Sequence, residues 1–485
     1  MKTSPLSGSS NLRSSASNAS TIWLDITTIY GWTTTAVGIV RMEMECATYA
    51  IEHLGSEVRF CRFDENQGYL VIEREQVIAL LDRLQCQVKS RDFVQPAAAD
   101  ALSVRVAGLK RRIKRSLGRL PPSLSITIWS FGTKRKTALR AFLRAYRDIC
   151  LAIQESIRPS IRPNDFASIV RTVRPYEVIR APFEKSDVYL SMGLDWDHKD
   201  LPYLFGQKKQ IGFKVVLFCY DIIPILLPHL CVGNVAAFFA KYFADVAWCA
   251  DDVFCISEHS KKDLRRFLKS IDAPVPSMQV VRLGASLSST VSTPIDPTIL
   301  ALARMPYLLF VSTIERRKNH EVLYRAYLQL IEAGMTKLPR LVFVGKLGWG
   351  VNDFLADVKF DQRIQGYITI LHYVTDAELK YLYQHADFTL FPSLYEGWGL
   401  PVAESLMSGK FCLASNRSSV PEVGQGFIQY IDPWDINAWA QQIAYFVAHP
   451  EEVKLREAKI TAQYQATTWQ QASEQIFSRV SDLLN

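Results

Sequence analysis

Two glutamates and the turn between them are the residues of this chain best suited to chemistry. Glu396 and Glu404 are separated by seven residues, and the sequence between them contains Gly-Trp-Gly-Leu-Pro. A carboxylate on a loop can accept hydrogen bonds from sugar hydroxyls, and one on the first turn of a helix can hold two neighbouring hydroxyls of a ribose. The alternative for Glu404 is structural, with its charge only complementing the helix dipole.

The flanking residues predict the elements that position these carboxylates. Residues 387–391 form an apolar, β-branched and aromatic run typical of a buried parallel strand, and Pro401 fits the start of a helix. The loop between them would lie beyond the carboxyl end of the strand, where open α/β sheets bind ligands, with the helix N-terminus facing an anion. Gly397 and Gly399 allow the backbone to approach that ligand closely.

Three further charged residues follow other predicted strands. Arg317 and Lys318 lie on the turn after the strand at residues 307–312, and Asp221 follows the strand at residues 215–219. A guanidinium binds phosphate oxygens in bidentate fashion and an ammonium is a compact charge, so both can stabilise a leaving group that gains negative charge. The alternatives are a solvated basic turn for the two cations and an Asx turn before a proline for the aspartate.

The composition indicates a globular chain of more than one domain. Its 485 residues are 48% hydrophobic and 21% charged, which is enough for two cores of ordinary size. Nine scattered cysteines without a CxxC pair are typical of buried thiols in a reducing compartment, which excludes a disulfide framework or a zinc site. Residues 1–20 are rich in Ser and Asn, so we expect a disordered tail and no signal peptide. These features favour a cytoplasmic protein.

Predicted strands alternate with helices on both sides of one aperiodic segment, as in doubly wound parallel sheets. We therefore expect an α/β protein of two Rossmann-like parallel-sheet domains facing a cleft. The last strand of the first domain is predicted at residues 280–284. The expected boundaries are an N-terminal domain at residues 21–285 with a basic helical insert at about 95–180, a linker at 286–297, a second domain at 298–468 and a final amphipathic helix at 469–485.

The positive charge is concentrated in the insert. Residues 101–180 contain 18 Lys or Arg against 4 Asp or Glu, although the whole chain carries only +8. Within them, residues 102–120 show an apolar helical stripe flanked by seven cations, a pattern typical of a helix on an anionic membrane surface. The alternative is a helix packed on its own domain with a solvated basic face.

The most apolar run, residues 215–231, is interrupted by charge and proline, so it is too short to span a membrane. Any membrane contact would therefore be peripheral, on the inner face of the cytoplasmic membrane.

A long stretch of the second domain carries a specific resemblance. Residues 386–410, ADFTLFPSLYEGWGLPVAESLMSGK, with Ser415 and residues 419–424, SVPEVG, resemble the family-4 retaining glycosyltransferases of GT-B architecture, especially bacterial polysaccharide and lipopolysaccharide mannosyltransferase-like members. The resemblance implies a terminal helix that crosses back to the first domain. It also implies a nucleotide-diphosphate sugar as donor, with GDP-mannose favoured, and a growing glycan or lipid-linked acceptor in bacterial surface polysaccharide biosynthesis.

The resemblance also implies roles for single residues. Arg317 and Lys318 match the pair that grips the diphosphate, and with Glu396 and Asp221 they are the catalytic candidates. The donor-binding residues that it implies are Gly38, Gly345, Val374, Ser393, Gly397, Trp398, Gly399, Leu400, Pro401 and Glu404. Two positions depart from the family pattern, because Tyr220 stands where a histidine is common and Ser312 where a glycine is common.

No bound metal, cofactor or nucleic-acid partner is expected. Asp195 and Asp197 have the Asp-x-Asp form by which some other glycosyltransferases hold a divalent cation, but their loop is better interpreted as lining an acceptor cleft. Two other functions stay open, because a fold does not fix a function. One is a nucleotide-sugar 2-epimerase of the same architecture, and the other is a non-catalytic subunit that binds a nucleotide sugar in a synthase complex.

Overall fold

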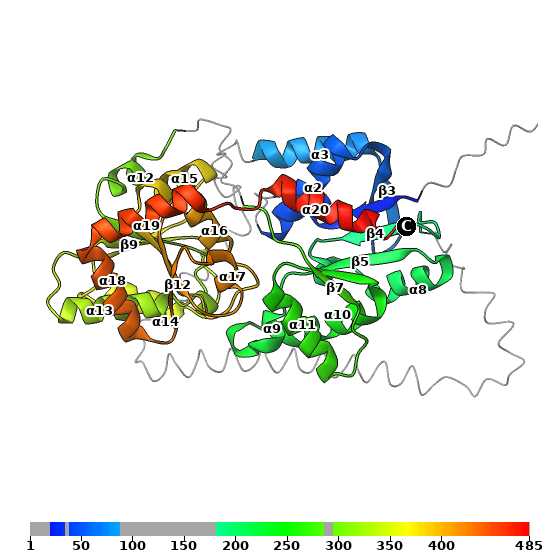
Figure 1. The fold of residues 1–485 in the computed structure, drawn as a ribbon. Helices are drawn as coiled ribbons and strands as arrows, with labels where there is room; N and C mark the ends of the chain where they lie inside the picture. Colours follow the sequence, from blue (N-terminus) through cyan, green and yellow to red (C-terminus); the bar gives the residue numbers. More distant parts are fainter. Residues whose placement is uncertain (1–19, 34–37, 88–180, 286–293, 485) are drawn as a thin grey trace, which may run out of the picture. The chain divides into compact units, whose positions relative to one another are not determined.

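A computed structural model describes residues 20–33, 38–87, 181–285 and 294–484. The chain divides into two compact units, residues 1–89 with 180–485 and residues 90–179, and every described residue belongs to the first. That unit contains two sheets, each with its own helices (Figure 1). The expected basic helix at residues 102–120 and residues 1–19 of the expected tail lie outside the described residues.

Within the described residues, the first sheet has seven strands, and six of them are parallel. In spatial order they are β3 (Gly68–Ile72), β2 (Val58–Asp64), β1 (Ile22–Asp25), β4 (Val188–Ser191), β5 (Lys214–Cys219), β6 (Asp252–Cys255) and β7 (Ser277–Val280). Strand β3 is antiparallel to β2 and forms one edge of the sheet, so the parallel sheet has one exception. The last strand ends at Val280, whereas the sequence predicted it at residues 280–284.

The second sheet is entirely parallel among the described residues. Its order is β10 (Ile368–Leu371), β9 (Arg340–Val344), β8 (Tyr307–Val311), β11 (Phe388–Phe391), β12 (Cys412–Ser415) and β13 (Gln429–Ile431). The order reverses between β8 and β11, which are neighbours in space but far apart in sequence. In open α/β sheets such a reversal is where the loops at the carboxyl ends form a binding site.

Helices connect the strands of both sheets. In the first domain they are α1 (Thr27–Tyr30), α2 (Ile39–His53), α3 (Arg74–Gln87), α7 (Asp195–His198), α8 (Leu201–Ile211), α9 (Ile223–Leu226), α10 (Val235–Cys249) and α11 (Glu258–Ser270). In the second they are α12 (Pro297–Leu302), α13 (His320–Glu332), α14 (Asn352–Phe360), α15 (Asp376–His385), α16 (Leu400–Met407), α17 (Val420–Gly424), α18 (Ile436–Ala448) and α19 (Pro450–Gln463). Helix α12 already begins at Pro297, the last residue of the expected linker. Among the described residues, none of these helices is both long and apolar enough to cross a bilayer.

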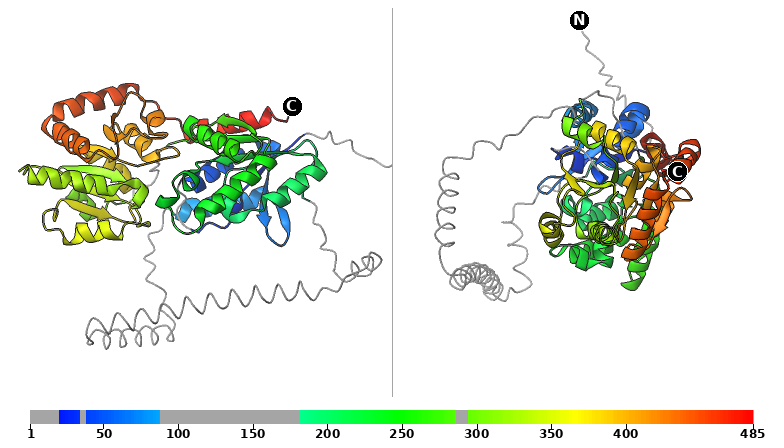
Figure 2. Two further views of the ribbon diagram at one scale, coloured as in Figure 1. Left: turned by 90° about the horizontal axis from the view of Figure 1, so that it is seen from below. Right: turned by 90° about the vertical axis from the view of Figure 1, so that its left-hand side faces the viewer.

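Helices lie on both faces of each sheet (Figure 2). Alternate residues of each strand face opposite sides of the sheet and pack under different helices. In β1, Ile22 and Leu24 belong to the core beneath α2 and α3, whereas Trp23 belongs to the core beneath α8 and α10. In β8, Leu308 and Tyr307 divide in the same way. Both faces of each sheet are therefore covered, which confirms the expected pair of Rossmann-like α/β domains.

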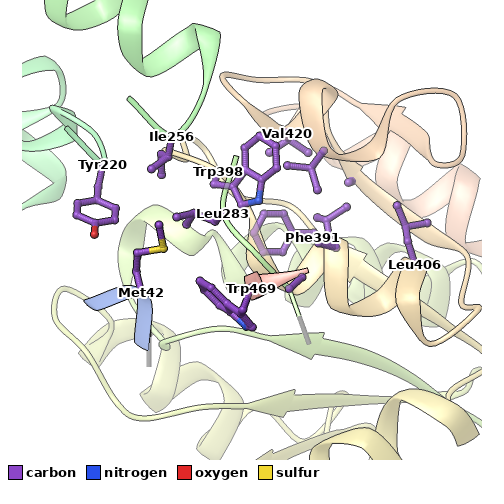
Figure 3. Packing of buried hydrophobic residues seen from close by; sticks show 14 of the residues in the cluster. Met42, Tyr220, Ile256, Leu283, Phe391, Trp398, Leu406, Val420 and Trp469 are labelled. Atoms are coloured by element: carbon purple, nitrogen blue, oxygen red, sulfur yellow. The ribbon is translucent and has the colours of Figure 1, made fainter. Parts of the chain in front are cut away.

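The final helix, α20 (Trp469–Ser481), packs against α2 of the first domain. The side chains of Cys46 and Ser473 are 3.4 Å apart, and the rings of Tyr49 and Phe477 stack with their centroids 5.9 Å apart. Trp469 lies close to Met42 and Leu283 at the start of this contact (Figure 3). These contacts confirm the expected helix that crosses back to the first domain.

Candidate active site

Glu396 forms an ion pair with each of the two predicted cations. One of its oxygens lies 2.9 Å from Nη1 of Arg317, and the other lies 2.5 Å from Nζ of Lys318. The opposite side of the Arg317 guanidinium contacts Glu315, with Nη2 and Oε1 2.8 Å apart. Three residues singled out as catalytic candidates therefore meet at one point, although 78 positions separate Lys318 from Glu396.

Burial and charge act in opposite directions on these groups. Burial favours a neutral carboxyl, but the charges of Arg317 and Lys318 lower the pKa of Glu396 to about 2. Burial also lowers the pKa of Lys318, which the Glu396 carboxylate only partly offsets. For Arg317, the effect of burial is outweighed by Glu396 and Glu315, which raise its pKa. At neutral pH Glu396 is therefore an anion that orients two cations.

The topology of the second sheet explains why these residues meet. The short turn Arg316–Lys318 follows β8, the loop containing Glu396 follows β11, and the two strands are hydrogen-bonded neighbours. The next residue, Asn319, has a φ of 61°, and its side-chain amide donates to the carbonyls of Pro392 and Pro433 at 3.2 and 2.8 Å. The Leu394 N–H also donates to the Arg317 carbonyl at 2.9 Å. These contacts fix the two loops relative to each other.

The loop around Glu396 is also held from the segment before α17. The Glu396 N–H donates to Oγ of Ser418 at 2.7 Å. The Ser419 hydroxyl lies 2.9 Å from the carbonyls of both Glu396 and Trp398. Trp398 is buried and packs near Phe391 and Val420 (Figure 3). Ser419 and Val420 belong to the motif on which the resemblance rested, and their role in the structure is to support the Glu396 loop.

Asp221 lies beside this loop. A Cβ built on Gly397 would stand 2.5 Å from the Tyr220 carbonyl oxygen and 3.0 Å from Cβ of Asp221, so only glycine fits at position 397. Burial raises the pKa of Asp221, while the positive charge of Arg317 acts to lower it. The carboxylate also accepts from the Ile223 N–H at 3.0 Å, which is the turn contact that the sequence offered as the alternative. Asp221 therefore lies next to Gly397 and also forms the turn contact.

Glu404 lies on the second turn of α16, one turn later than the sequence suggested. The Tyr383 hydroxyl donates to Oε2 of Glu404 at 3.1 Å. Burial raises the pKa of Glu404 to about 7, against the lowering effects of this hydrogen bond and of the Arg41 charge. The carboxyl thus changes protonation near neutral pH. Its partner Tyr383 lies on α15, outside the segment between the two glutamates, so the spacing of the glutamates could not predict this contact.

The other expected donor-binding residues occupy different settings. Gly345 directly follows β9, and a Cβ there would stand 1.9 Å from the Ser312 carbonyl oxygen, so the glycine is required by close backbone packing. Gly399 has a φ of 119° and precedes α16, which begins with Leu400 and Pro401. Ser393 is fully buried in the loop after β11, and Val374 is half-buried before α15. Gly38, with a φ of 55°, precedes α2 of the first domain, and none of its described hydrogen bonds reaches the Glu396 cluster.

In the Asp-x-Asp segment, Asp195 forms a buried ion pair. Asp195 is buried, and its carboxylate lies 2.8 Å from Nζ of Lys199, which also contacts Asp25 at 3.0 Å. Asp197 is exposed and does not share this contact. Over the part of the chain that the structure describes, no group of three acidic, His or Cys side chains could hold a metal ion.

The arrangement is suited to binding an anion whose charge increases during a reaction. Arg317 and Lys318 face two carboxylates, Glu396 and Glu315, so their charges are balanced before any ligand binds. A diphosphate that contacts the two cations would take over part of this pairing. Fixed cations in a buried setting stabilise developing negative charge more strongly than solvated ones, because they need little reorganisation.

Part of the chain is similar to known glycosyltransferases. Residues 297–465 match the family described as glycosyl transferases group 1. The chain is 29% identical over 227 residues to O-antigen chain mannosyltransferase B of Escherichia coli, which covers 46% of this chain and 58% of the relative. It is 26% identical over 223 residues to the serotype-specific mannosyltransferase WbdA of Escherichia coli, covering 44% of this chain and 26% of the relative. The chain thus spans less than two thirds of the length of either relative.

Two solved structures show weak likenesses. Sucrose-phosphate synthase from Thermosynechococcus elongatus is 17% identical with a TM-score of 0.47, over 61% of this chain and 73% of the other. Anabaena HepE in complex with UDP and glucose is 15% identical with a TM-score of 0.47, over 61% and 77%. The family match is the finding that bears on the site. Arg317, Lys318 and both glutamates lie within the residues that match glycosyl transferases group 1.

Proposed function

We propose that the chain is a retaining glycosyltransferase that moves a hexose from a nucleotide-diphosphate sugar to a growing glycan or a lipid-linked acceptor. The observation that carries this proposal is the ion-paired group of Arg317, Lys318 and Glu396 at the carboxyl edge of the second sheet. The group stands within the segment that matches glycosyl transferases group 1.

The proposed reaction uses each charged side chain in a separate role. Arg317 and Lys318 bind the diphosphate and stabilise the negative charge that it gains when the glycosidic bond breaks. Glu396 keeps both cations oriented and accepts hydrogen bonds from the donor sugar. Glu404 accepts from the ribose hydroxyls, and Asp221 contacts the sugar or the acceptor from the first domain. The residues supply positioning and charge, and no cofactor is required.

The donor that we favour is GDP-mannose. Relatives that the chain partly matches are named as mannosyltransferases, among them the O-antigen chain enzymes of Escherichia coli and Salmonella typhimurium. We place the reaction in the synthesis of bacterial surface polysaccharide, on the cytoplasmic side of the membrane. The acceptor is then a glycan or a lipid-linked sugar.

A donor screen tests this function. Purified protein is incubated with GDP-mannose, UDP-glucose and other nucleotide sugars, with and without membrane-extracted acceptor, and the released nucleotide and the sugar products are measured. We expect nucleotide release that depends on the acceptor, and an α-linked product from an α-linked donor. A changed sugar still attached to its nucleotide would support an epimerase instead, and binding without turnover of any donor would support a non-catalytic subunit.

A further inference from the structure

Two buried serines on α11 lie between the loops that carry the site carboxylates. Ser257 is the N-cap of α11 and Ser260 lies on its first turn, with exposed fractions of 0% and 3%. Oγ of Ser257 accepts a hydrogen bond from the Ser260 N–H at 3.0 Å, the usual contact of an N-cap. That contact uses Oγ of Ser257 as an acceptor, so the hydroxyl protons of both serines can still be donated to other groups.

Those two protons serve two carbonyl groups outside the helix. The Ser257 hydroxyl lies 2.9 Å from the Gly397 carbonyl oxygen and 2.9 Å from Oγ of Ser260. The Ser260 hydroxyl lies 2.9 Å from the Tyr220 carbonyl oxygen and 3.3 Å from that of Gly397. Tyr220 is the residue before Asp221, and Gly397 is the residue after Glu396. Each serine is therefore bonded to a peptide group next to a site carboxylate.

Helix α11 is itself anchored to the second domain. Both oxygens of Glu422 accept from the first N–H groups of the helix, those of Glu258 and His259, at 2.9 Å each. The Tyr395 hydroxyl donates to Oδ2 of Asp263 at 2.6 Å, which ties the second turn of the helix to the residue before Glu396. The serines thus stand on a rigid element, as a positioning group requires.

We propose that Ser257 and Ser260 are positioning residues that hold Asp221 and Glu396 at a fixed separation during sugar transfer. The two loops touch where Gly397 lacks a side chain, so no packing of side chains can fix their distance at that point. The serine hydroxyls supply the missing constraint. This inference rests on the proposed transfer reaction, because only a reaction that uses both carboxylates needs their separation to be fixed.

The test removes both hydroxyls and compares the result with the loss of an equally buried hydroxyl elsewhere. The variant is Ser257→Ala with Ser260→Ala. The control is Ser473→Ala, since Ser473 is 1% exposed and its hydroxyl lies 3.4 Å from Sγ of Cys46 on α2. We expect kcat to fall about 10- to 100-fold in the double variant, because small displacements of reacting groups have effects of this size. Affinity for free nucleoside diphosphate should stay within about twofold, because that ligand is held by other groups.

Hydrogen–deuterium exchange provides a second measurement that does not depend on turnover. In the double variant, exchange should become faster in peptides covering residues 218–224 and 394–400 and stay unchanged in the control. Unchanged kcat, or unchanged exchange in both peptides, would overturn the proposal. If the double variant does not fold, the same kcat and exchange measurements are made on the single variant Ser260→Ala, which keeps the N-cap. A wild-type protein without transfer would refute the proposed function, whereas the exchange data would still decide whether the serines fix the loops.

Discussion

At the scale of single residues, Glu396 is the group that organises the site. It is 7% exposed and pairs with two cations, so removing its charge would leave both cations partly unpaired in a buried setting. Removing one of the cations is less disruptive, because Glu396 keeps its other partner. Substitution of a single cation is therefore the cleaner way to examine the chemistry.

Lys318→Ala should reduce turnover by removing one of the two charges that stabilise the departing diphosphate. Preorganised electrostatic contacts of this kind contribute about 2 to 4 kcal/mol to the transition state, so kcat should fall by about one and a half to three orders of magnitude. The matched control is Arg316→Ala, which removes an exposed cation from the same turn. Steady-state kinetics check both variants. A near-normal kcat in Lys318→Ala would remove this residue from the mechanism.

Glu404 should make nucleotide binding depend on pH near neutrality. Its pKa is raised to about 7, so the carboxyl becomes protonated as the pH falls below 7 and loses capacity to accept hydrogen bonds from ribose hydroxyls. Affinity for a nucleoside diphosphate should therefore weaken between pH 8 and pH 6, by at most about tenfold per pH unit. Calorimetric titration of wild type and Glu404→Gln at several pH values measures this. The variant should keep only the pH dependence of the phosphate itself, and equal slopes in the two proteins would contradict the assignment.

The same raised pKa affects stability with a definite sign. The folded state holds the Glu404 proton more tightly than the unfolded state, so this group loses stabilising effect as the pH rises from about 4.5 to about 7. Glu404→Gln should flatten the decrease in the free energy of unfolding over this range, as measured by denaturant titration. A slope unchanged by the substitution would show that the carboxyl titrates normally.

The sequence predicted the charged residues of the site better than their supports. Arg317, Lys318 and Glu396 could be grouped because each follows a predicted strand, and parallel strands end at one edge of a sheet. Tyr383 and Ser257 could not be found in this way. Each contacts the site through one side-chain hydroxyl from a helix or helix start, and no sequence spacing reports such a contact across 21 or 140 positions.

At the scale of elements, the contact between α20 and the first domain depends on a glycine. A Cβ on Gly284 would stand 2.5 Å from Cα of Trp469 and 2.6 Å from its backbone nitrogen. The neighbouring Ala285 N–H donates to the Thr467 carbonyl at 2.9 Å, so the chain before α20 is fixed there as well. Backbone atoms cannot rotate away as the end of a side chain can.

Gly284→Ala should therefore destabilise the protein by about 1 to 3 kcal/mol, the range of overpacking in a filled core. The control is Gly206→Ala inside α8, where a Cβ would meet no atom within 4 Å. That change should be neutral or stabilising by up to about 1 kcal/mol, because alanine is the better helix former. Chemical denaturation distinguishes the two signs. Equal changes in the free energy of unfolding for the two variants would mean that the backbone at the contact between α20 and the first domain can shift at little energetic cost.

The elements themselves were predicted with uneven success, for physical reasons. Strands β5 and β8 were each predicted to within one residue, because both are apolar runs that end in turns. Strand β7 lies earlier than predicted, since its sequence SMQV is partly polar and the apolar residues that follow, Val281 and Leu283, pack in the core beyond the end of the strand. The antiparallel strand β3 was not predicted, because its pairing is fixed by the turn after β2.

At the scale of the whole molecule, the positive charge of residues 102–120 predicts a peripheral contact with an anionic membrane surface. Changing Arg111, Arg112, Lys114 and Arg115 together to glutamine should release the protein from anionic vesicles, since each cation near such a surface contributes about 1 kcal/mol. Transfer to a water-soluble acceptor analogue should stay largely intact. Vesicle sedimentation at low and high salt checks this, because salt screens the attraction. Binding that ignores both salt and the substitutions would contradict it.

The measurement that tests the central claim most directly is nucleotide release from GDP-mannose by three proteins, with and without acceptor. The wild type should release GDP at a rate that requires the acceptor and should yield an α-linked mannoside. Glu396→Gln should lose that release, whereas Arg316→Ala should keep it. Absence of release by the wild type with every nucleotide sugar, or equal release by Glu396→Gln, would contradict the assignment of sugar transfer to this site.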